Sequence, residues 1–495
     1  MPAAQTSDLT LAPAVVHALR EALVAADYTV AGVTELLGPL AHAALGRNET
    51  TPGLRATTDG SPLATMTRLW QLQAPVASAD VEAALPGLLE PLSAAGALER
   101  SVEEVRARVD VRPYADDLRD WWVLSDLTPG LDGDQRPVAA DHVLGVSSAS
   151  STLAQLTVRE PFGSALDLGT GSGVQALHLS THCDRTVATD VNPRALAMTR
   201  LNAALNDVDV DVRSGSLFEP VSGETFDLVV TNPPFVISPA TGERLVYRDS
   251  GLPGDSVVEY IVREAPQHLT EGGWCQVLAN WAIESGRPWD ERLAGWLDPG
   301  CDALVVQREV VDPAAYVELW LKDSGHHGAE EYLARYDTWL AWFEEQGVEG
   351  IGFGWVNLRL GGPAKPGSHR LLDWPHGVEQ PIAPAIAAWG TALGVEIGLD
   401  TTLVARADLV QETVGPTGAE HPETIVIRQQ RGFRRARTAD TVVAGLVGAC
   451  DGELTVGQIL AALADLLELD PDDARTTYLP VVRELVEDGF LQIAD

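Results

Sequence analysis

ALDLGTGSGVQAL, residues 165–177, joins an apolar strand pattern to a helical pattern through a turn with glycine at alternate positions. Asp167 lies near the end of the strand, and Gly169, Gly171 and Gly173 follow it. Glycine permits a sharp backbone turn and lets a ligand approach the main chain closely. Backbone N–H groups in such a turn, and at the start of the next helix, can bind an anion. We therefore predict a strand–turn–helix unit with a ligand site, although the spacing differs from the GxGxxG of dinucleotide-binding turns.

Strand and helix patterns alternate from about residue 150 onward. The strand patterns are rich in β-branched residues and nearly continuous in apolar character, as in strands buried on both faces. Helical patterns at 193–206 and 255–269 separate some of them, and 313–347 indicates a helical insertion before the last strand. Seven strands are predicted, at 164–169, 185–190, 210–215, 226–232, 274–280, 301–310 and 350–360. Right-handed crossovers between such strands give an α/β, doubly wound sheet with its ligand crevice at the strand carboxyl ends.

Asp190 ends the second predicted strand, 21 residues after Gly169. A carboxylate at this place can accept hydrogen bonds from both hydroxyls of a ribose. The alternative is that Asp190 belongs to the N-terminal cap of the next helix. Asn192 can fill the capping role with Pro193 at the first helical position, which leaves Asp190 to the ligand.

Asn232-Pro233-Pro234-Phe235 directly follows the fourth predicted strand. Two prolines remove two backbone donors and stiffen the loop, so that carbonyl oxygens and the Asn232 side chain become fixed acceptors. Fixed acceptors beside an aromatic ring suit a planar NH2 group, whose hydrogens they bind while the ring stacks on its face. The alternative is a proline-rich loop without a ligand.

With these three motifs, residues 142–362 resemble a class I S-adenosylmethionine-dependent methyltransferase of the NPPY/F branch. That branch methylates amide or exocyclic nitrogen, and it includes release-factor glutamine, ribosomal-RNA guanine and DNA or RNA adenine methyltransferases. The resemblance implies a Rossmann-like, seven-stranded methyltransferase sheet and S-adenosylmethionine as cofactor. It also implies that the loop at 142–154 closes over the cofactor.

The resemblance assigns roles to individual residues. It implies that the methionine end of the cofactor is bound by Asp167, Gly169, Thr170, Gly171 and Gly173. It places Asp190 at the ribose and Ser216 and Leu217 beside the adenine, and it counts Asn232 among the cofactor-binding residues. For catalysis it implies Asn232, Pro233, Pro234 and Phe235, and we add Phe235, Arg248 and Asp249 as candidate substrate contacts. Many relatives carry Asp where Ser216 stands, so the sequence departs from the family pattern at the adenine.

The acceptor's chemistry suggests the mechanism. An amide or aniline-like nitrogen is a poor nucleophile because its lone pair is delocalised. Hydrogen bonds from its NH2 group to Asn232 Oδ1 and the Pro233 carbonyl favour a pyramidal nitrogen, an interaction that is strongest in the transition state. The proton leaves once the nitrogen is cationic, so we predict no catalytic His or Cys and no metal.

The flanking regions carry mostly helical patterns. Residues 1–141 end in two strand patterns, 105–114 and 121–127, and residues 363–495 end in helices and a short strand. We predict that both are winged-helix-like, with the N-terminal one serving substrate recognition. Turn-rich segments at 127–142 and 361–369 are the predicted linkers.

Charge restricts the partners. The chain of 495 residues has 71 acidic and 34 basic side chains, a net charge of −37, which disfavours tight non-specific binding to DNA. The exception is the basic run Arg428–Arg437, which either follows an RNA backbone or neutralises nearby acidic helices. We therefore expect a protein or RNA substrate, with a protein glutamine amide ahead of a base amine. A small molecule or peptide acceptor, and a non-catalytic cofactor sensor, are further alternatives.

Other features point to a soluble, cytoplasmic protein. No run of about 18 uncharged apolar residues occurs, so no membrane-spanning helix is expected. The first 28 residues lack a basic start and are typical of an amphipathic helix rather than a signal peptide. The four cysteines form no CxxC pair, so neither a disulfide framework nor a zinc knuckle is expected. His178, His182 and Cys183 suit a metal site less well than a pair of histidines at a helix end.

Overall fold

The computed structural model describes residues 9–133, 138–139, 141–234, 236–239, 252–326, 328–362, 366–417 and 423–494. By their contacts they divide into two compact units. One unit comprises Met1–Ala154 and Pro161–Trp374, and the other comprises Gln155–Glu160 and Pro375–Asp495. The predicted boundary between residues 1–141 and residues 142–362 lies inside the first of these units. The division of the chain into these two domains stays a prediction.

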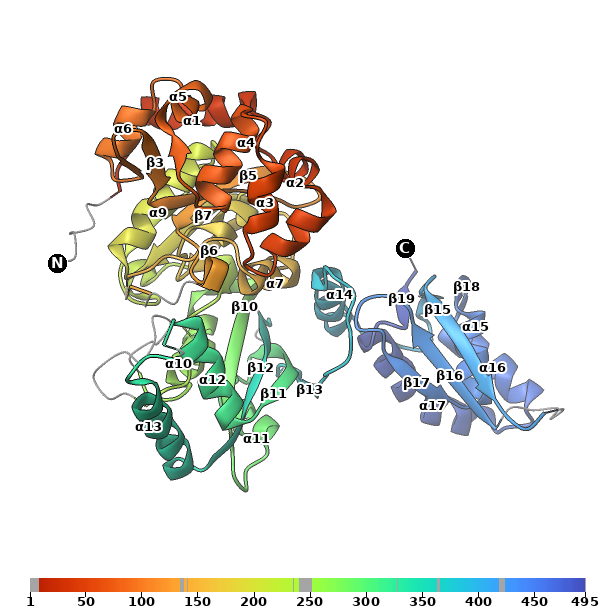
Figure 1. The fold of residues 1–495 in the computed structure, drawn as a ribbon. Helices are drawn as coiled ribbons and strands as arrows, with labels where there is room; N and C mark the ends of the chain where they lie inside the picture. Colours follow the sequence, from red (N-terminus) through yellow and green to blue (C-terminus); the bar gives the residue numbers. More distant parts are fainter. Residues whose placement is uncertain are drawn as a thin grey trace. The chain divides into compact units, whose positions relative to one another are not determined.

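An eight-stranded sheet forms the centre of the larger unit (Figure 1). Its strands are β6 (Phe162–Leu168), β7 (Cys183–Asp190), β8 (Asp211–Ser214), β9 (Phe226–Thr231), β10 (Leu269–Glu284), β11 (Cys301–Val311), β12 (Val348–Leu360) and β13 (His369–Asp373). Their order is β13-β11-β12-β10-β9-β6-β7-β8. Strands β8, β7, β6, β9 and β10 run parallel, whereas β12 is antiparallel to both of its neighbours. The expected Rossmann-like fold class is confirmed.

The prediction of seven strands was wrong by one. Strand β13 pairs in parallel with β11, from Ala303↔His369 to Gln307↔Asp373, immediately after the predicted linker. None of its five residues is fully buried, because it lies at the edge of the sheet. An edge strand without a buried face lacks the apolar pattern on which the prediction depended.

Helices cover the sheet and position its loops. They are α7 (Ser148–Leu156), α8 (Val174–Leu179), α9 (Pro193–Leu205), η3 (Glu219–Val221), α10 (Ser256–Glu264), η4 (Ala265–His268), α11 (Trp289–Ala294), α12 (Pro313–Asp323) and α13 (Tyr332–Glu345). Apolar side chains of α10 and α11 share one core with β6, β9 and β10. The predicted insertion consists of α12 and α13, which lie side by side and contact β12 (Figure 1).

The first part of the chain belongs to the same unit. Its elements are α1 (Pro13–Ala25), α2 (Val30–Leu45), α3 (Thr51–Ala56), α4 (Pro62–Met66), η1 (Thr67–Gln71), β1 (Val76–Ala77), α5 (Ser78–Ala84), α6 (Leu89–Ala94), β2 (Leu98–Arg100), β3 (Glu104–Ala107), β4 (Val109–Ala115), β5 (Asp120–Asp126) and η2 (Leu131–Gly133). The strand predicted at 105–114 is two strands in two sheets, because the chain bends at Arg108, whose N–H bonds to the Ala97 carbonyl. The winged-helix form of this region stays a prediction.

The smaller unit holds two three-stranded sheets, β18-β14-β19 and β15-β16-β17. Its elements are α14 (Ala383–Leu393), β14 (Thr402–Ala405), β15 (Leu409–Val414), β16 (Thr424–Gln429), β17 (Ala436–Ala439), α15 (Thr441–Ala449), β18 (Asp451–Thr455), α16 (Val456–Leu466), α17 (Pro471–Glu487) and β19 (Leu491–Ile493). Helices α15, α16 and α17 enclose a core of its own. Its winged-helix form also stays a prediction.

Within the described residues, no helix is long and apolar enough to cross a membrane. The four cysteines are free thiols.

Candidate functional site

The sheet register brings three predicted motifs to one place. Leu168 at the end of β6 pairs with Thr189 of β7 and with Thr231 of β9. The residues that follow Leu168, Thr189 and Thr231 in the chain are Gly169, Asp190 and Asn232. The glycine turn, the ribose-binding candidate and the acceptor motif therefore leave the sheet at the same level. The Thr231 hydroxyl also donates to the Leu168 carbonyl at 2.7 Å, which fixes two of these strand ends to each other.

The glycine turn depends on its residue type. Gly169, Gly171 and Gly173 have φ angles of 74°, 58° and 84°, all in the left-handed region. A Cβ atom at Gly169 or Gly171 would have no neighbour within 4 Å, whereas one at Gly173 would lie 3.1 Å from Thr199 Cγ2. The first two glycines therefore leave an open face above the turn, and the third permits close packing of α9.

Three backbone donors of this turn are used inside the protein. The N–H groups of Gly169 and Thr170 both donate to the Thr189 carbonyl at 2.9 Å. The Gly171 N–H donates to Asp190 Oδ2 at 3.0 Å. These three amides therefore have partners within the protein, so anion binding by the turn and the start of α8 stays a prediction, and the turn also offers a ligand close approach to its backbone.

Asp167 lies beneath the turn. It is 1 % exposed, and its Oδ2 accepts hydrogen bonds from the Thr170 hydroxyl at 2.6 Å and from the Ala176 N–H at 3.0 Å. Burial raises the pKa of Asp167 to about 7. In this structure Asp167 closes the turn and binds a backbone donor of helix α8.

Asp190 has a different environment. Its Oδ1 accepts the Asn192 N–H at 2.8 Å, and Oδ2 accepts the Gly171 N–H. Asn192 caps α9 by accepting the Arg194 N–H at 3.0 Å, with Pro193 at the first helical position. A carboxylate has about four acceptor positions, so Asp190 retains acceptor capacity for a ligand hydroxyl group.

The predicted adenine-binding residues follow β8. The Gly215 N–H donates to the Asp190 carbonyl at 3.1 Å, which joins this loop to the ribose-binding candidate. Ser216 is exposed, and Leu217 is half-buried with a φ of 48°, a conformation that is uncommon for leucine. Phe218 is buried and stacks on His268, with ring centroids 4.4 Å apart.

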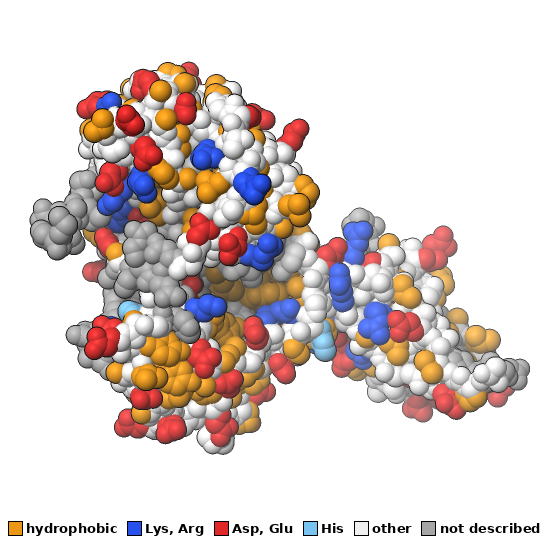
Figure 2. All heavy atoms as spheres, viewed as in Figure 1, with side chains coloured by type: hydrophobic (Ala, Val, Ile, Leu, Met, Phe, Trp, Pro, Cys, Tyr) orange, Lys and Arg blue, Asp and Glu red, His pale blue; other side chains and the backbone are white. Residues whose placement is uncertain are grey.

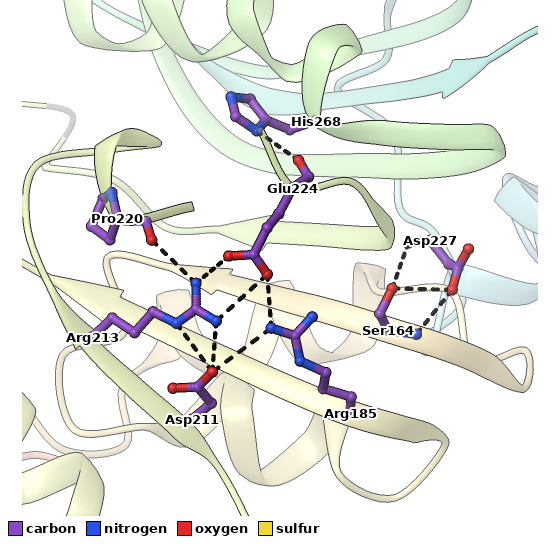
Figure 3. A network of polar contacts seen from close by, with 8 residues as sticks. All are labelled: Ser164, Arg185, Asp211, Arg213, Pro220, Glu224, Asp227 and His268. Carbon is purple, nitrogen blue, oxygen red and sulfur yellow. Dashed lines mark hydrogen bonds and ion pairs between the residues drawn. The ribbon is translucent and has the colours of Figure 1, made fainter. Parts of the chain in front are cut away.

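An ion-pair network supports β8 from its amino end (Figure 3). The guanidinium groups of Arg213 and Arg185 both contact the carboxylates of Asp211 and Glu224. The Glu224 carbonyl bonds to His268 Nδ1 at 3.1 Å, so the network reaches the ring that stacks on Phe218. The pKa values of Asp211 and Glu224 are lowered, chiefly by hydrogen bonds from the arginines.

The acceptor motif leaves one polar atom unsatisfied. Pro233 is buried and Pro234 is exposed, while Phe235, Arg248 and Asp249 lie outside the described residues. Asn232 Oδ1 is buried and has no hydrogen-bond partner among the residues that the structure describes. A buried acceptor without a partner is costly and uncommon in native structures, so this oxygen is a candidate acceptor for a ligand donor.

A link between the glycine turn and the N-terminal region was not predicted. Asn202 of α9 accepts the Leu124 N–H at 2.7 Å and donates to the carbonyls of Leu124 and Ser172 at 2.8 and 2.7 Å. Asn206, one turn later, makes the same pair of bonds with the N–H and carbonyl of Trp122. Two asparagines four residues apart, Asn202 on α9 and Asn206 at its C-terminal cap, were the available signal, but they do not reveal their partner.

The other candidates have structural partners. His178 lies on α8 and bonds to the Tyr114 hydroxyl at 2.8 Å, whereas His182 and Cys183 lie beyond the helix. No group of three His, Cys, Asp or Glu side chains suited to a metal was found among the described residues. Two arginines of the run Arg428–Arg437 pair with Glu412 and Glu484, and Arg435 pairs with Asp488. On the face shown in Figure 2, basic side chains of the smaller unit are interspersed with acidic ones.

Residues 144–287 match the family model described as methyltransferase small domain, and residues 25–108 match a domain of unknown function (DUF7059). The chain is 34 % identical over 131 residues to a release factor glutamine methyltransferase of Geobacter sulfurreducens, which covers 24 % of the chain and 46 % of that relative. It is 29 % identical over 138 residues to the ribosomal RNA small subunit methyltransferase C of Salmonella arizonae, covering 28 % of the chain and 36 % of the relative. The chain thus spans less than half the length of these relatives.

A solved structure, the T. thermophilus 16S rRNA N2 G1207 methyltransferase in complex with AdoMet and guanosine, aligns with 50 % of the chain and 66 % of its own length. Its TM-score is 0.28 and its sequence identity is 14 %. The family match and the sequence relatives confirm that the central part of the chain is a domain of the S-adenosylmethionine-dependent methyltransferase type.

Proposed function

We propose that this chain is an enzyme that transfers a methyl group from S-adenosylmethionine to a planar NH2 group of a macromolecule, with a protein glutamine amide favoured. The observation that carries the proposal is the buried Oδ1 of Asn232, which has no hydrogen-bond partner among the described residues and lies at the same sheet level as Asp190 and the glycine turn.

The residues present fit the cofactor. The open face above Gly169 and Gly171 admits a ligand to the backbone, and the Asp190 carboxylate retains acceptor capacity toward the ribose. Ser216 and Leu217 border the adenine in this proposal. When bound, the cofactor supplies a methyl group on a sulfonium, which needs no further activation.

The chain's own contribution is to orient the acceptor. Asn232 Oδ1 and the Pro233 carbonyl accept the two N–H bonds of the acceptor group, which directs the nitrogen lone pair toward the methyl group. These hydrogen bonds strengthen as the nitrogen becomes pyramidal and positive, so they stabilise the transition state more than the bound substrate. The proposal requires no side-chain base.

Charge favours a protein acceptor over a nucleic acid. The net charge is −37, and carboxylates pair with Arg428, Arg435 and Arg437 of the basic run. A polyanion therefore gains little from this surface. The names of the glutamine methyltransferase relatives point the same way. A base amine of ribosomal RNA is the second candidate, supported by the similarity to ribosomal RNA methyltransferases.

The flanking regions complete the proposal. Residues 1–141 and 363–495 select and present the substrate to the central domain, and the protein acts in the cytoplasm. The names of the relatives support this location, because release factors and ribosomes are cytoplasmic in bacteria.

Transfer of a tritiated methyl group tests the proposal. The chain and labelled S-adenosylmethionine are incubated with one acceptor per reaction. The acceptors are a purified bacterial release factor, ribosomal protein uL3 and ribosomal subunits. We expect label that resists nuclease and is lost on protease treatment. Label that is lost to nuclease supports the RNA alternative instead, and a folded chain that binds S-adenosylhomocysteine but labels no acceptor supports the cofactor-sensor alternative.

A further inference from the structure

The segment directly after the acceptor motif is held by the helical insertion. The Tyr316 hydroxyl, on α12, accepts the Ile237 N–H at 2.9 Å. Trp339 Nε1, on α13, donates to the Ile237 carbonyl at 2.9 Å. The insertion thus binds the backbone donor and the backbone acceptor of one residue, which lies five positions after Asn232.

The surroundings make these two bonds rigid. Ile237, Tyr316 and Trp339 are each 0 % exposed and belong to one apolar cluster with Val236 and Phe343. Burial raises the pKa of Tyr316 to about 12, so its hydroxyl stays neutral. The Ser238 carbonyl accepts the Gly254 N–H at 3.2 Å, which fixes the chain on the other side of Ile237.

We propose that Tyr316 and Trp339 are positioning residues that set the place of the acceptor motif, and that the α12–α13 insertion thereby controls transfer to the NH2 group. Neither residue is proposed to touch the cofactor or the reacting atoms. Asn232 and Pro233 are joined to β9 at one end, and the insertion fixes the other end at Ile237. A displaced loop leaves the cofactor site intact but misaligns the acceptor nitrogen, so the effect falls on transfer rather than on cofactor binding.

The surface formed by α10, α12 and α13 carries exposed apolar side chains, which are common where a protein contacts another macromolecule. Figure 2 shows hydrophobic side chains gathered over α10, α12 and α13. Leu319 of α12 and Leu333 of α13 are 48 % and 70 % exposed, and Tyr260 of α10 is 44 % exposed.

The test compares Tyr316→Phe with Phe343→Leu in the full-length protein. Tyr316→Phe keeps the ring and removes the acceptor of the Ile237 N–H, whereas Phe343→Leu disturbs the same cluster without removing a polar group. We expect hydrogen exchange at the Ile237 amide to accelerate about tenfold in Tyr316→Phe. Phe343→Leu should lower the midpoint of urea unfolding without this local effect. The affinity for S-adenosylhomocysteine, measured by calorimetry, should stay within about twofold of the unmodified protein in both variants, because cofactor contacts are unchanged.

The kinetic arm rests on the proposed function. With the release factor as acceptor, Tyr316→Phe should lower kcat about tenfold while the KM for the cofactor is retained, and Phe343→Leu should retain kcat. Unchanged exchange at Ile237, equal acceleration in both variants, or an unchanged kcat in Tyr316→Phe would each overturn the inference. If the unmodified chain labels no acceptor, the proposed function fails, and the exchange rates at Ile237 decide whether the insertion holds this segment.

Discussion

The carboxylate of Asp190 accepts the backbone N–H of Gly171 at 3.0 Å, so the end of β7 and the middle glycine of the turn are fixed to each other. The Asn192 N–H holds the second carboxylate oxygen at 2.8 Å. Backbone N–H groups therefore orient the carboxylate of Asp190, the ribose-binding candidate, before a ligand binds. Such preorganisation reduces the entropic cost of binding.

Asp190→Ala should weaken the binding of S-adenosylhomocysteine by about 1–3 kcal/mol, because the ribose loses its acceptor. Ser216→Ala is the comparison: Ser216 borders the adenine in the proposal but is exposed, so its loss should weaken binding less than the loss of Asp190. Calorimetry on both variants measures the difference. Equal affinities in the two variants would show that Asp190 does not bind the ribose.

Stability should depend on pH through Asp167. Burial raises its pKa in the folded protein to about 7 from an ordinary value of 3.8, so the folded state retains a proton that the unfolded chain has lost. The free energy of unfolding should therefore fall as pH rises from about 4 to about 7, by up to about 1.4 kcal/mol per pH unit from this group.

Urea unfolding of the parent protein and Asp167→Asn at several pH values isolates this contribution. Asparagine has no proton to lose in this range, so the difference in stability between variant and parent should shift in favour of the variant as pH rises from 4 to 7. A difference that stays constant with pH would contradict the assignment.

Asn202→Ala should affect both strand β5 and the glycine turn. It removes bonds to Leu124 and the bond to the Ser172 carbonyl, whereas Asn206→Ala removes only the equivalent bonds to Trp122 within β5 and one within α9. Each variant should lose about 1–3 kcal/mol of stability, because buried backbone groups lose partners. Only Asn202→Ala should also weaken S-adenosylhomocysteine binding, and a similar loss in Asn206→Ala would exclude a specific link to the turn.

Arg435→Ala should destabilise the smaller unit without changing RNA binding. Arg435 Nη1 lies 2.9 Å from Asp488 Oδ1, and both side chains are mostly buried. Loss of this charged hydrogen bond should cost about 1.5–3 kcal/mol. Thermal unfolding measures the first effect, and filter binding of a labelled ribosomal RNA fragment measures the second. A marked drop in RNA affinity would revive the RNA-binding interpretation of Arg428–Arg437.

The motifs with local signals were predictable from the sequence. The turn at Gly169–Gly173 and the cap formed by Asn192 and Pro193 depend on residues close together in the chain, and the structure has both. The bonds from Asn202 to Leu124 and from Ile237 to Tyr316 join residues 78 and 79 positions apart. No local pattern carries such information, because it depends on how distant elements pack.

Asp167 shows a second limit. The resemblance implies that Asp167 holds the methionine end of the cofactor, which stays a prediction; the motif did not predict that its Oδ2 also binds the Thr170 hydroxyl and the Ala176 N–H. An acidic residue at a strand end is compatible with several sets of partners, and only the packing around it determines which it binds. Its burial in turn accounts for the raised pKa.

The central claim is that Asn232 Oδ1 serves the acceptor nitrogen, and Asn232→Ala tests it most directly. Methyl transfer to the release factor and calorimetry with S-adenosylhomocysteine are measured on the same preparation of this variant. Our account predicts cofactor affinity close to that of the unmodified protein, with transfer lowered about a hundredfold or more, the usual scale for loss of a transition-state hydrogen bond. Full transfer activity in Asn232→Ala on an acceptor that the unmodified protein methylates would contradict it.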